Sequence, residues 1–209
     1  MSRFIILFLT FMLSVSFPNE IPLHQLPEWE LDVIQETFKL IRDHRHLNLG
    51  NKLRAIPWLY PDNYCAFRAD LAVSLIEKKK SSLDLPRKII ALSSSNIKLR
   101  ALSRYAFMGK TVSWGYHVAL AVKNGQQVYV LDPALNYSAP LLLDDWKNKL
   151  NYRRNLPITI INCHPYSWGL PPHSDCQNPT RKVMNPSKRE IKKILRKEKR
   201  RLRWKKVFQ

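Results

Sequence analysis

Two polar residues, His117 and Asp132, interrupt the apolar sequence SWGYHVALAVKNGQQVYVLDP at residues 113–133. Asn124-Gly125 lies between the two apolar runs and predicts a β-hairpin with a two-residue loop, because both residues tolerate the positive φ of a type I′ turn. In that register His117 and Asp132 are directly opposed, with Cβ atoms about 5 Å apart, so that the carboxylate can accept the imidazole N–H. A structural hydrogen bond is the alternative, and a third residue is needed to make the pair catalytic.

Cys65 is a candidate for that third residue. It follows the turn and cap sequence Pro61-Asp62-Asn63 and begins an apolar run that ends in lysines 78–80, which predicts a helix with Cys65 in its first turn. The positive end of the helix and a neighbouring imidazolium would both favour the thiolate. An ordinary buried or disulfide-bonded cysteine is the alternative. Nucleophile, base and orienting carboxylate, in the order Cys, His, Asp, fit thiol catalysis.

The helix and the hairpin must pack together for these residues to meet. Apolar residues recur at helical spacing on the helix, at Ala69, Ala72, Val73 and Ile76. Small residues line the hairpin face that carries the histidine and aspartate, with Ala119 predicted opposite Val130 and Ala121 opposite Val128. We expect the helix to pack on this alanine face.

Further helices and strands are predicted before, between and after this helix and hairpin in the sequence. Helical spacing and acids in the first turn predict a helix over residues 28–43, and a short helix is predicted over 143–150. Three more strands are predicted over 87–93, 97–103 and 157–163. One central helix that bears the cysteine, packed on an antiparallel sheet of four or five strands that bears the histidine and aspartate, is an α+β fold. The sequence contains no internal repeat and no phosphate-binding glycine motif.

Residues 60–150 carry a family resemblance in their motifs and in the order of those motifs. The motifs are CAFRADLA, RKIIALSSSNIKL, WGYHVALAV, VLDPAL and DDWKNKL. They resemble the bacterial protein glutaminases, enzymes of papain-like and transglutaminase-like architecture that deamidate glutamine side chains in proteins. Matched residue by residue, the family's catalytic cysteine, histidine and aspartate fall on Cys65, His117 and Asp132. The family motif is similar to Cys-Tyr-Ala-Arg-Ala, whereas residues 65–69 read Cys-Ala-Phe-Arg-Ala, with the aromatic residue and alanine exchanged.

The resemblance implies a hydrolase for proteins or peptides with exposed glutamine. It implies a thioester intermediate on Cys65 and no metal or other cofactor. Trp114 and Tyr116 lie near the histidine end of the strand and are candidate walls of the substrate pocket. The same triad would also serve a transglutaminase or a thiol protease. A further alternative is a non-catalytic secreted binding module that acts through the basic C-terminal residues 181–209. We expect a monomer.

The first 16 residues are interpreted as a secretory signal peptide. They contain one arginine, an apolar stretch and a small-residue cleavage site at Ser14-Val15-Ser16. An uncleaved N-terminal anchor is the alternative. Export predicts a secreted or periplasmic protein, in which disulfide bonds are permitted.

The chain contains three cysteines, an odd number. A disulfide between Cys163 and Cys176 would leave Cys65 as the free thiol, in agreement with a nucleophile. A zinc site that adds His164 and His173 to these two cysteines is the second interpretation, although the spacing within each ligand pair is unusual for zinc. A pair of free cysteines is the third.

The remaining sequence divides into an N-terminal helical segment (17–59), a catalytic domain (60–180) and a basic tail (181–209). The tail contains fourteen Lys or Arg and two Glu, and so carries twelve of the nineteen net positive charges of the chain. Ser187 and Glu190 form a capping-box pattern. An amphipathic helix follows, with Ile191, Ile194, Leu195 and Leu202 on one face. Such a tail could bind an acidic membrane surface, nucleic acid or an acidic protein, or it could be a solvated, partly disordered segment.

Overall fold

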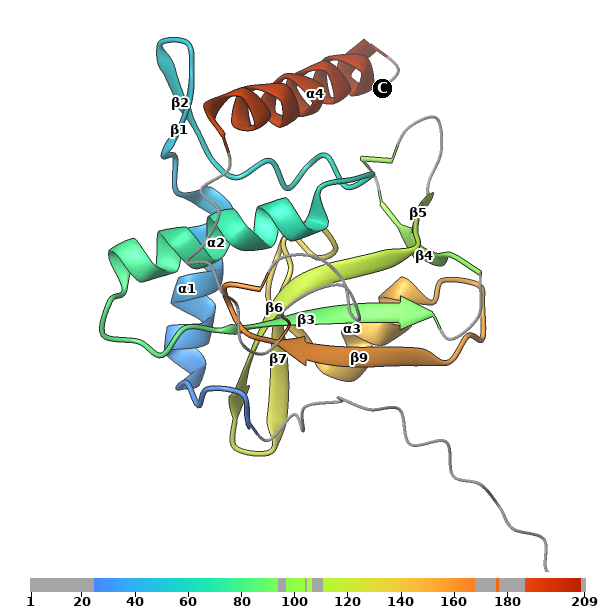
Figure 1. Cartoon of the computed structure of the whole chain (residues 1–209). Coiled ribbons are helices and arrows are strands. Elements are labelled where there is room, and N and C mark those ends of the chain that lie inside the picture. The colour runs from blue at the N-terminus through green and yellow to red at the C-terminus, as the bar shows by residue number, and fades with distance from the viewer. Residues whose placement is uncertain are drawn as a thin grey trace, which may run out of the picture.

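A five-stranded antiparallel sheet forms the centre of the molecule, with helices on both of its faces (Figure 1). The computed structural model describes residues 25–93, 97–103, 105–106, 111–167, 176 and 187–207, with side chains up to Trp204 in the last helix. The predicted signal peptide lies outside these residues. In chain order the elements are α1 (Leu31–Asp43), β1 (Leu47–Leu49), β2 (Lys52–Arg54), α2 (Cys65–Lys79), β3 (Arg87–Ser93), β4 (Leu99–Leu102), β5 (Thr111–Trp114), β6 (Tyr116–Asn124), β7 (Gln127–Leu131), β8 (Leu141–Leu142), α3 (Leu143–Leu150), β9 (Ile158–Cys163) and α4 (Lys188–Val207).

The sheet has the strand order β8-β7-β6-β3-β9, and every neighbouring pair is antiparallel. The predicted α+β class and the predicted elements are therefore confirmed, most with boundaries within three residues. The strand predicted over 97–103 is β4, which pairs with β5 in a separate two-stranded sheet. β1 and β2 form a third sheet, a hairpin between α1 and the segment that leads to Cys65.

Two hydrophobic cores fill the opposite faces of the central sheet. One joins α1 and α2 to Val118, Leu120 and Val122 of β6. The other joins α3 and the β4–β5 pair to the alternate residues Ala119 and Ala121. The prediction that α2 packs on the alanine face is therefore wrong. The small residues instead accommodate the bulky Trp146 of α3, which is fully buried.

The predicted register of the β6–β7 hairpin is wrong by two residues. Asn124 pairs with Gln127, and Ala121 pairs with Val130, so the loop is Gly125-Gln126. Gly125 has φ +58°, whereas Asn124 and Gln126 do not have positive φ, which fits a type II′ turn with glycine at its first central position. Extending this register places Asp132 opposite Ala119 and diagonal to His117. Because side chains alternate with a period of two, the shift leaves each residue on its predicted face.

Helix α4 packs on the domain with its apolar face. Ile194 and Leu195 are buried in the core that contains α1 and α2, so this part of the basic tail is not a solvated, disordered segment. Ser187 and Glu190 form the predicted capping box, in which the Glu190 N–H donates to Ser187 Oγ at 3.2 Å and the Ser187 N–H donates to Glu190 Oε2 at 3.1 Å. Within the residues that the structure describes, no helix combines the length and the apolar character needed to cross a membrane.

The opposite face of α4 is exposed and cationic. We call it the cationic face, and it consists of Lys188, Arg189, Lys192, Lys193, Arg196, Lys199, Arg200 and Arg203.

Candidate active site

Cys65 is the first residue of α2, and the turn before it places it there. Tyr64 has left-handed φ and ψ of 68° and 28°, which turns the chain into the helix. Asn63 Oδ1 accepts the Tyr64 N–H at 2.8 Å and so braces this turn, instead of capping the first helical turn as predicted. The first turn of α2 has neither a side-chain cap nor an acidic residue. Its N–H groups and the positive end of the helix dipole therefore lie beside the Cys65 thiol without a competing carboxylate from the helix.

His117 and Asp132 meet as predicted, although by a diagonal and not a direct cross-strand contact. Nε2 of His117 donates to Asp132 Oδ2 at 2.8 Å, and both side chains are buried. Trp146 Nε1 donates to the same oxygen at 2.9 Å, while the Ala134 N–H donates to Oδ1 at 3.2 Å. Three donors therefore fix both carboxylate oxygens. The imidazole ring lies between two indoles, with ring centroids 4.5 Å from Trp114 and 5.9 Å from Trp146.

The Cys65 thiol interacts with the imidazole of His117. Burial opposes ionisation of the thiol, but the neighbouring His117 imidazole, the charge of Arg68 and the Val118 N–H together lower the pKa of the thiol below its ordinary value. Burial also opposes protonation of His117, but the Asp132 carboxylate and the interaction with Cys65 raise its pKa to about 9. Nε2 is bonded to Asp132, so Nδ1 is the ring nitrogen left for the thiol. The favoured state of the pair is thiolate and imidazolium.

Arg68 is a fully buried cation close to Cys65. Its Nη1 donates to the Tyr60 carbonyl at 2.8 Å and to the Asn63 carbonyl at 2.6 Å, which fixes the segment before Cys65. Burial lowers the pKa of Arg68, while interactions with Cys65 and Asp132 act in the opposite direction. The guanidinium therefore holds the Cys65 turn in place and adds positive charge near both Cys65 and Asp132.

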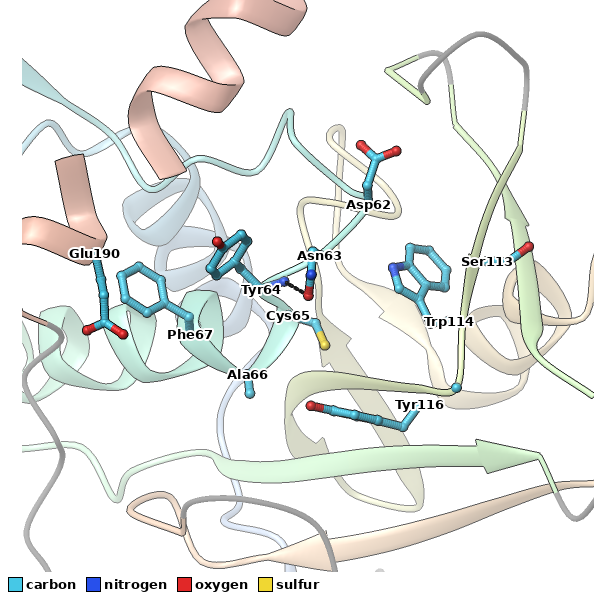
Figure 2. A pocket seen from close by; sticks show the side chains of 11 residues that line it. Asp62, Asn63, Tyr64, Cys65, Ala66, Phe67, Ser113, Trp114, Tyr116 and Glu190 are labelled. Carbon is cyan, nitrogen blue, oxygen red and sulfur yellow. Dashed lines mark hydrogen bonds between the residues drawn. The ribbon is translucent and has the colours of Figure 1, made fainter. Parts of the chain in front are cut away.

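A pocket of about 520 Å³ opens onto Cys65 (Figure 2). The sulfur points toward the space between Trp114 and Tyr116, the two predicted wall residues. Trp114 Nε1 donates to the Pro61 carbonyl at 2.9 Å, which ties this wall to the Cys65 turn. The volume is within the usual range for small-molecule sites, about 300 to 1,000 Å³. The lining residues are Asp62, Asn63, Tyr64, Cys65, Ala66, Phe67, Ser113, Trp114, Gly115, Tyr116 and Glu190.

Helix α4 completes the site by holding the segment from Leu59 to Tyr64. Glu198 Oε1 accepts the Leu59 N–H at 2.9 Å, and burial raises the pKa of Glu198 to about 7. Arg201 forms an ion pair with Asp62 at 2.8 Å. The ammonium of Lys197 lies 5.1 Å from the centre of the Tyr64 ring, a cation–π contact. Cys65 therefore follows a segment that is held by Arg68 on one side and by α4 on the other.

Comparison with known proteins identifies the family. A family model described as Glutaminase (Gln_deamidase_2) matches residues 34–150, more than half of the 209-residue chain. The chain belongs to this glutaminase family. The family is one of deamidating hydrolases, and its matched region contains Cys65, His117 and Asp132. No curated protein sequence matches the chain.

Solved protein-glutaminase structures share the fold of this glutaminase-family chain. The NMR structure of protein-glutaminase from Chryseobacterium proteolyticum has a TM-score of 0.52 and 20% identity over 70% of this chain and 77% of that chain. A crystal structure of protein-glutaminase has a TM-score of 0.52 and 21% identity over 68% and 75% of the two chains. A crystal structure of pro-protein-glutaminase has a TM-score of 0.53 and 18% identity, and the match spans 78% of this chain but only 55% of that one.

The remaining cysteines of this glutaminase-family chain lie apart from the site. Cys163 and Cys176 form a disulfide, and Cys65 is the free cysteine. The two thiolates that the zinc interpretation needs are therefore bonded to each other, and His173 lies outside the described residues. Among the described residues no cluster of three metal-ligating side chains occurs.

Several residues of the glutaminase-family site were not predicted as part of it. Trp146 lies in the DDWKNKL motif and Arg68 in the CAFRADLA motif, so the resemblance contained a signal for both. Glu190, Glu198 and Arg201 lie in the tail, where composition indicated only a basic helix.

Proposed function

We propose that this chain is a protein-glutamine deamidase in which Cys65, His117 and Asp132 act as nucleophile, acid–base and orienting carboxylate. The observation that carries the proposal is the position of the Cys65 thiol beside the His117 ring, which is hydrogen-bonded to Asp132, at an aromatic pocket. Family membership supports deamidation as the reaction. The papain-like and transglutaminase-like geometry of the triad is part of the same proposal.

The first half of the reaction forms a thioester. The Cys65 thiolate attacks the carboxamide carbon of a protein-bound glutamine, and the carbonyl oxygen gains the negative charge. The Cys65 backbone N–H, at the start of α2, donates to this oxyanion. His117 then gives its proton to the amide nitrogen as the C–N bond breaks, and ammonia departs. Asp132 stabilises the imidazolium before this transfer and keeps the ring in the orientation that the transfer requires.

The second half hydrolyses the thioester. The neutral His117 accepts a proton from water, which attacks the thioester carbon. The C–S bond breaks, glutamate is released, and the thiolate and imidazolium are restored. The balance is one glutamine side chain and one water converted to one glutamate and one ammonium ion, with no redox change.

The reaction is tested by following all products from one substrate. We expect the chain without residues 1–16 to release ammonia from casein. The substrate mass should rise by about one dalton per ammonia, as replacement of an amide by a carboxylate requires. Casein incubated without the protein is the control. New peptide ends would identify a protease, and crosslinked casein would identify a transglutaminase. A folded preparation that produces none of these would contradict the proposal.

The pH profile should report the thiolate–imidazolium pair. Because the pKa of His117 is raised to about 9, the imidazolium persists at neutral pH and is lost as pH rises through about 9. Because the pKa of Cys65 is lowered, the thiolate is lost only as pH falls below that lowered value. We expect kcat/KM to pass through a plateau, with an alkaline limb near pH 9 and an acid limb from Cys65. A kcat/KM that still rises above pH 9 would contradict the raised pKa.

We also propose that the protein is exported. The signal-peptide interpretation of residues 1–16 and the Cys163–Cys176 disulfide support a secreted or periplasmic location, because structural disulfides persist in oxidising compartments. Proteins with accessible glutamine side chains in that compartment are the proposed substrates.

A further inference from the structure

The cationic face of α4 has no anionic partner within the described part of the chain. Its eight Lys and Arg side chains are exposed, and none of them forms a salt bridge among the described residues. The other exposed residues of α4 with described side chains are Glu190 and Trp204. The charges are therefore uncompensated along most of the helix, and they project a positive field into solvent.

This arrangement disfavours a membrane as the partner of α4. An amphipathic helix binds a bilayer by burying its apolar face among the lipids. In this protein Ile194 and Leu195 are buried against the domain, and Ile191 and Leu202 are partly covered. Among the described side chains of α4, Trp204 is then the one large apolar group left exposed, at the end of the helix, so the interaction of the docked helix is mainly electrostatic.

The helix also runs along the rim of the active-site pocket. Glu190, near its start, lines the pocket beside Phe67, as Figure 2 shows. Lys197, about two turns later, contacts Tyr64, and Arg201, about three turns later, contacts Asp62; Tyr64 and Asp62 line the same pocket. Lys193 and Arg200, at the edge of the cationic face, neighbour Lys197 at helical spacing. A polypeptide whose glutamine enters the pocket therefore passes beside this edge of the cationic face.

We propose that the cationic face of α4 is a docking surface for an acidic segment of the protein substrate, close in sequence to the reacting glutamine. The inference rests on the proposed function. Charge complementarity identifies the occupant as acidic, and the position beside the pocket identifies it as part of the substrate itself. From Lys192 to Arg203 the helix rises about 16 Å, the length of about five extended residues. A run of about five Asp or Glu on one side of the glutamine would fit this surface.

The test compares two peptides that share a central glutamine and differ only in one flank, five glutamates or five serines. We expect the acidic peptide to have a kcat/KM about tenfold higher at low salt, through a lower KM with kcat unchanged. The advantage should disappear at about 1 M salt, where the Debye length is about 3 Å. Binding is measured separately, by fluorescence anisotropy of a labelled acidic peptide without glutamine.

Matched charge reversals localise the effect. The variant Lys192→Glu/Lys199→Glu should lose the acidic-peptide preference and the anisotropy signal, while its activity on the serine peptide is retained. The control Lys39→Glu/Lys149→Glu reverses two exposed lysines outside α4, with the same change in net charge. This control should keep the acidic-peptide preference and the anisotropy signal.

Each outcome separates this inference from the proposed function. Equal kcat/KM for both peptides would overturn the proposed docking surface while deamidation stands. So would an equal loss of the acidic-peptide preference in the control variant. Loss of reaction with both peptides would contradict the proposed function, and the anisotropy measurement would still decide whether the face binds an acidic chain. Tighter binding of a single-stranded oligonucleotide or of anionic lipid vesicles than of the acidic peptide would also overturn the inference.

Discussion

Replacing Cys65 by alanine is expected to lower the rate of ammonia release by about 10⁴-fold or more, because the variant lacks the thiolate that forms the acyl intermediate. The fold should persist, since Cys65 is a small residue at the edge of the core and makes no disulfide. The measurement is the rate of ammonia release from casein, together with thermal unfolding to show that the variant is folded.

Thiol alkylation provides an independent control for this prediction. Because Cys163 and Cys176 are joined, iodoacetamide should attach one group per molecule of the non-reduced protein and abolish activity in parallel. A serine at position 65 tests whether a hydroxyl at the same place can replace the thiol, and we expect it to be nearly as inactive as alanine. Substantial activity in the folded alanine variant would remove Cys65 from the mechanism.

Replacing Asp132 by asparagine is expected to lower kcat by about 10³-fold, because the imidazolium loses its counter-charge and at least one of the three hydrogen bonds to the carboxylate is lost. His117 and Trp146 donate to Oδ2, and the Ala134 N–H donates to Oδ1. An asparagine side chain has one accepting oxygen, so in either orientation its NH₂ group faces at least one of these donors. Without that counter-charge, the pKa of His117 should fall.

The pH profile separates this electrostatic role from a structural one. In Asp132→Asn the alkaline limb of kcat/KM should move below pH 9, in proportion to the lowered pKa of His117. Trp146→Phe is the control, because it removes one donor to Asp132 but keeps a large aromatic ring in the core; we expect a loss of about tenfold or less. An asparagine variant with normal kcat and an unchanged alkaline limb would show that Asp132 is not the orienting carboxylate.

Much of the site could be predicted from the sequence because its determinants are local. The alternation of β6 and β7 places His117 and Asp132 on one face, and this result survives an error of two residues in the register. The position of the turn is predicted wrongly because Asn124-Gly125 suits a type I′ turn and Gly125-Gln126 suits a type II′ turn. Packing of the strands decides between the two. Which sheet face α2 covers depends on the size of Trp146 on another element, which no local pattern reveals.

The role of α4 could not be predicted for a similar reason. Its capping box and apolar stripe were visible in the sequence, but its partner was not. The contact between Glu198 and Leu59 joins residues 139 positions apart. A buried glutamate among many lysines and arginines gives no signal of that distant contact in composition or periodicity.

That long-range contact has a consequence for the order in which the protein folds. The hairpin and α2 can form from neighbouring residues, whereas the Glu198–Leu59 bond closes a loop that contains most of the domain. Closing this loop costs conformational entropy before the contacts of α4 with the domain can offset that loss. We therefore expect it to be one of the slower steps of folding. The contact between α4 and the segment before Cys65 is then expected to form late, after the sheet that carries His117 has assembled. Folding kinetics would therefore separate the appearance of secondary structure from the appearance of a competent nucleophile.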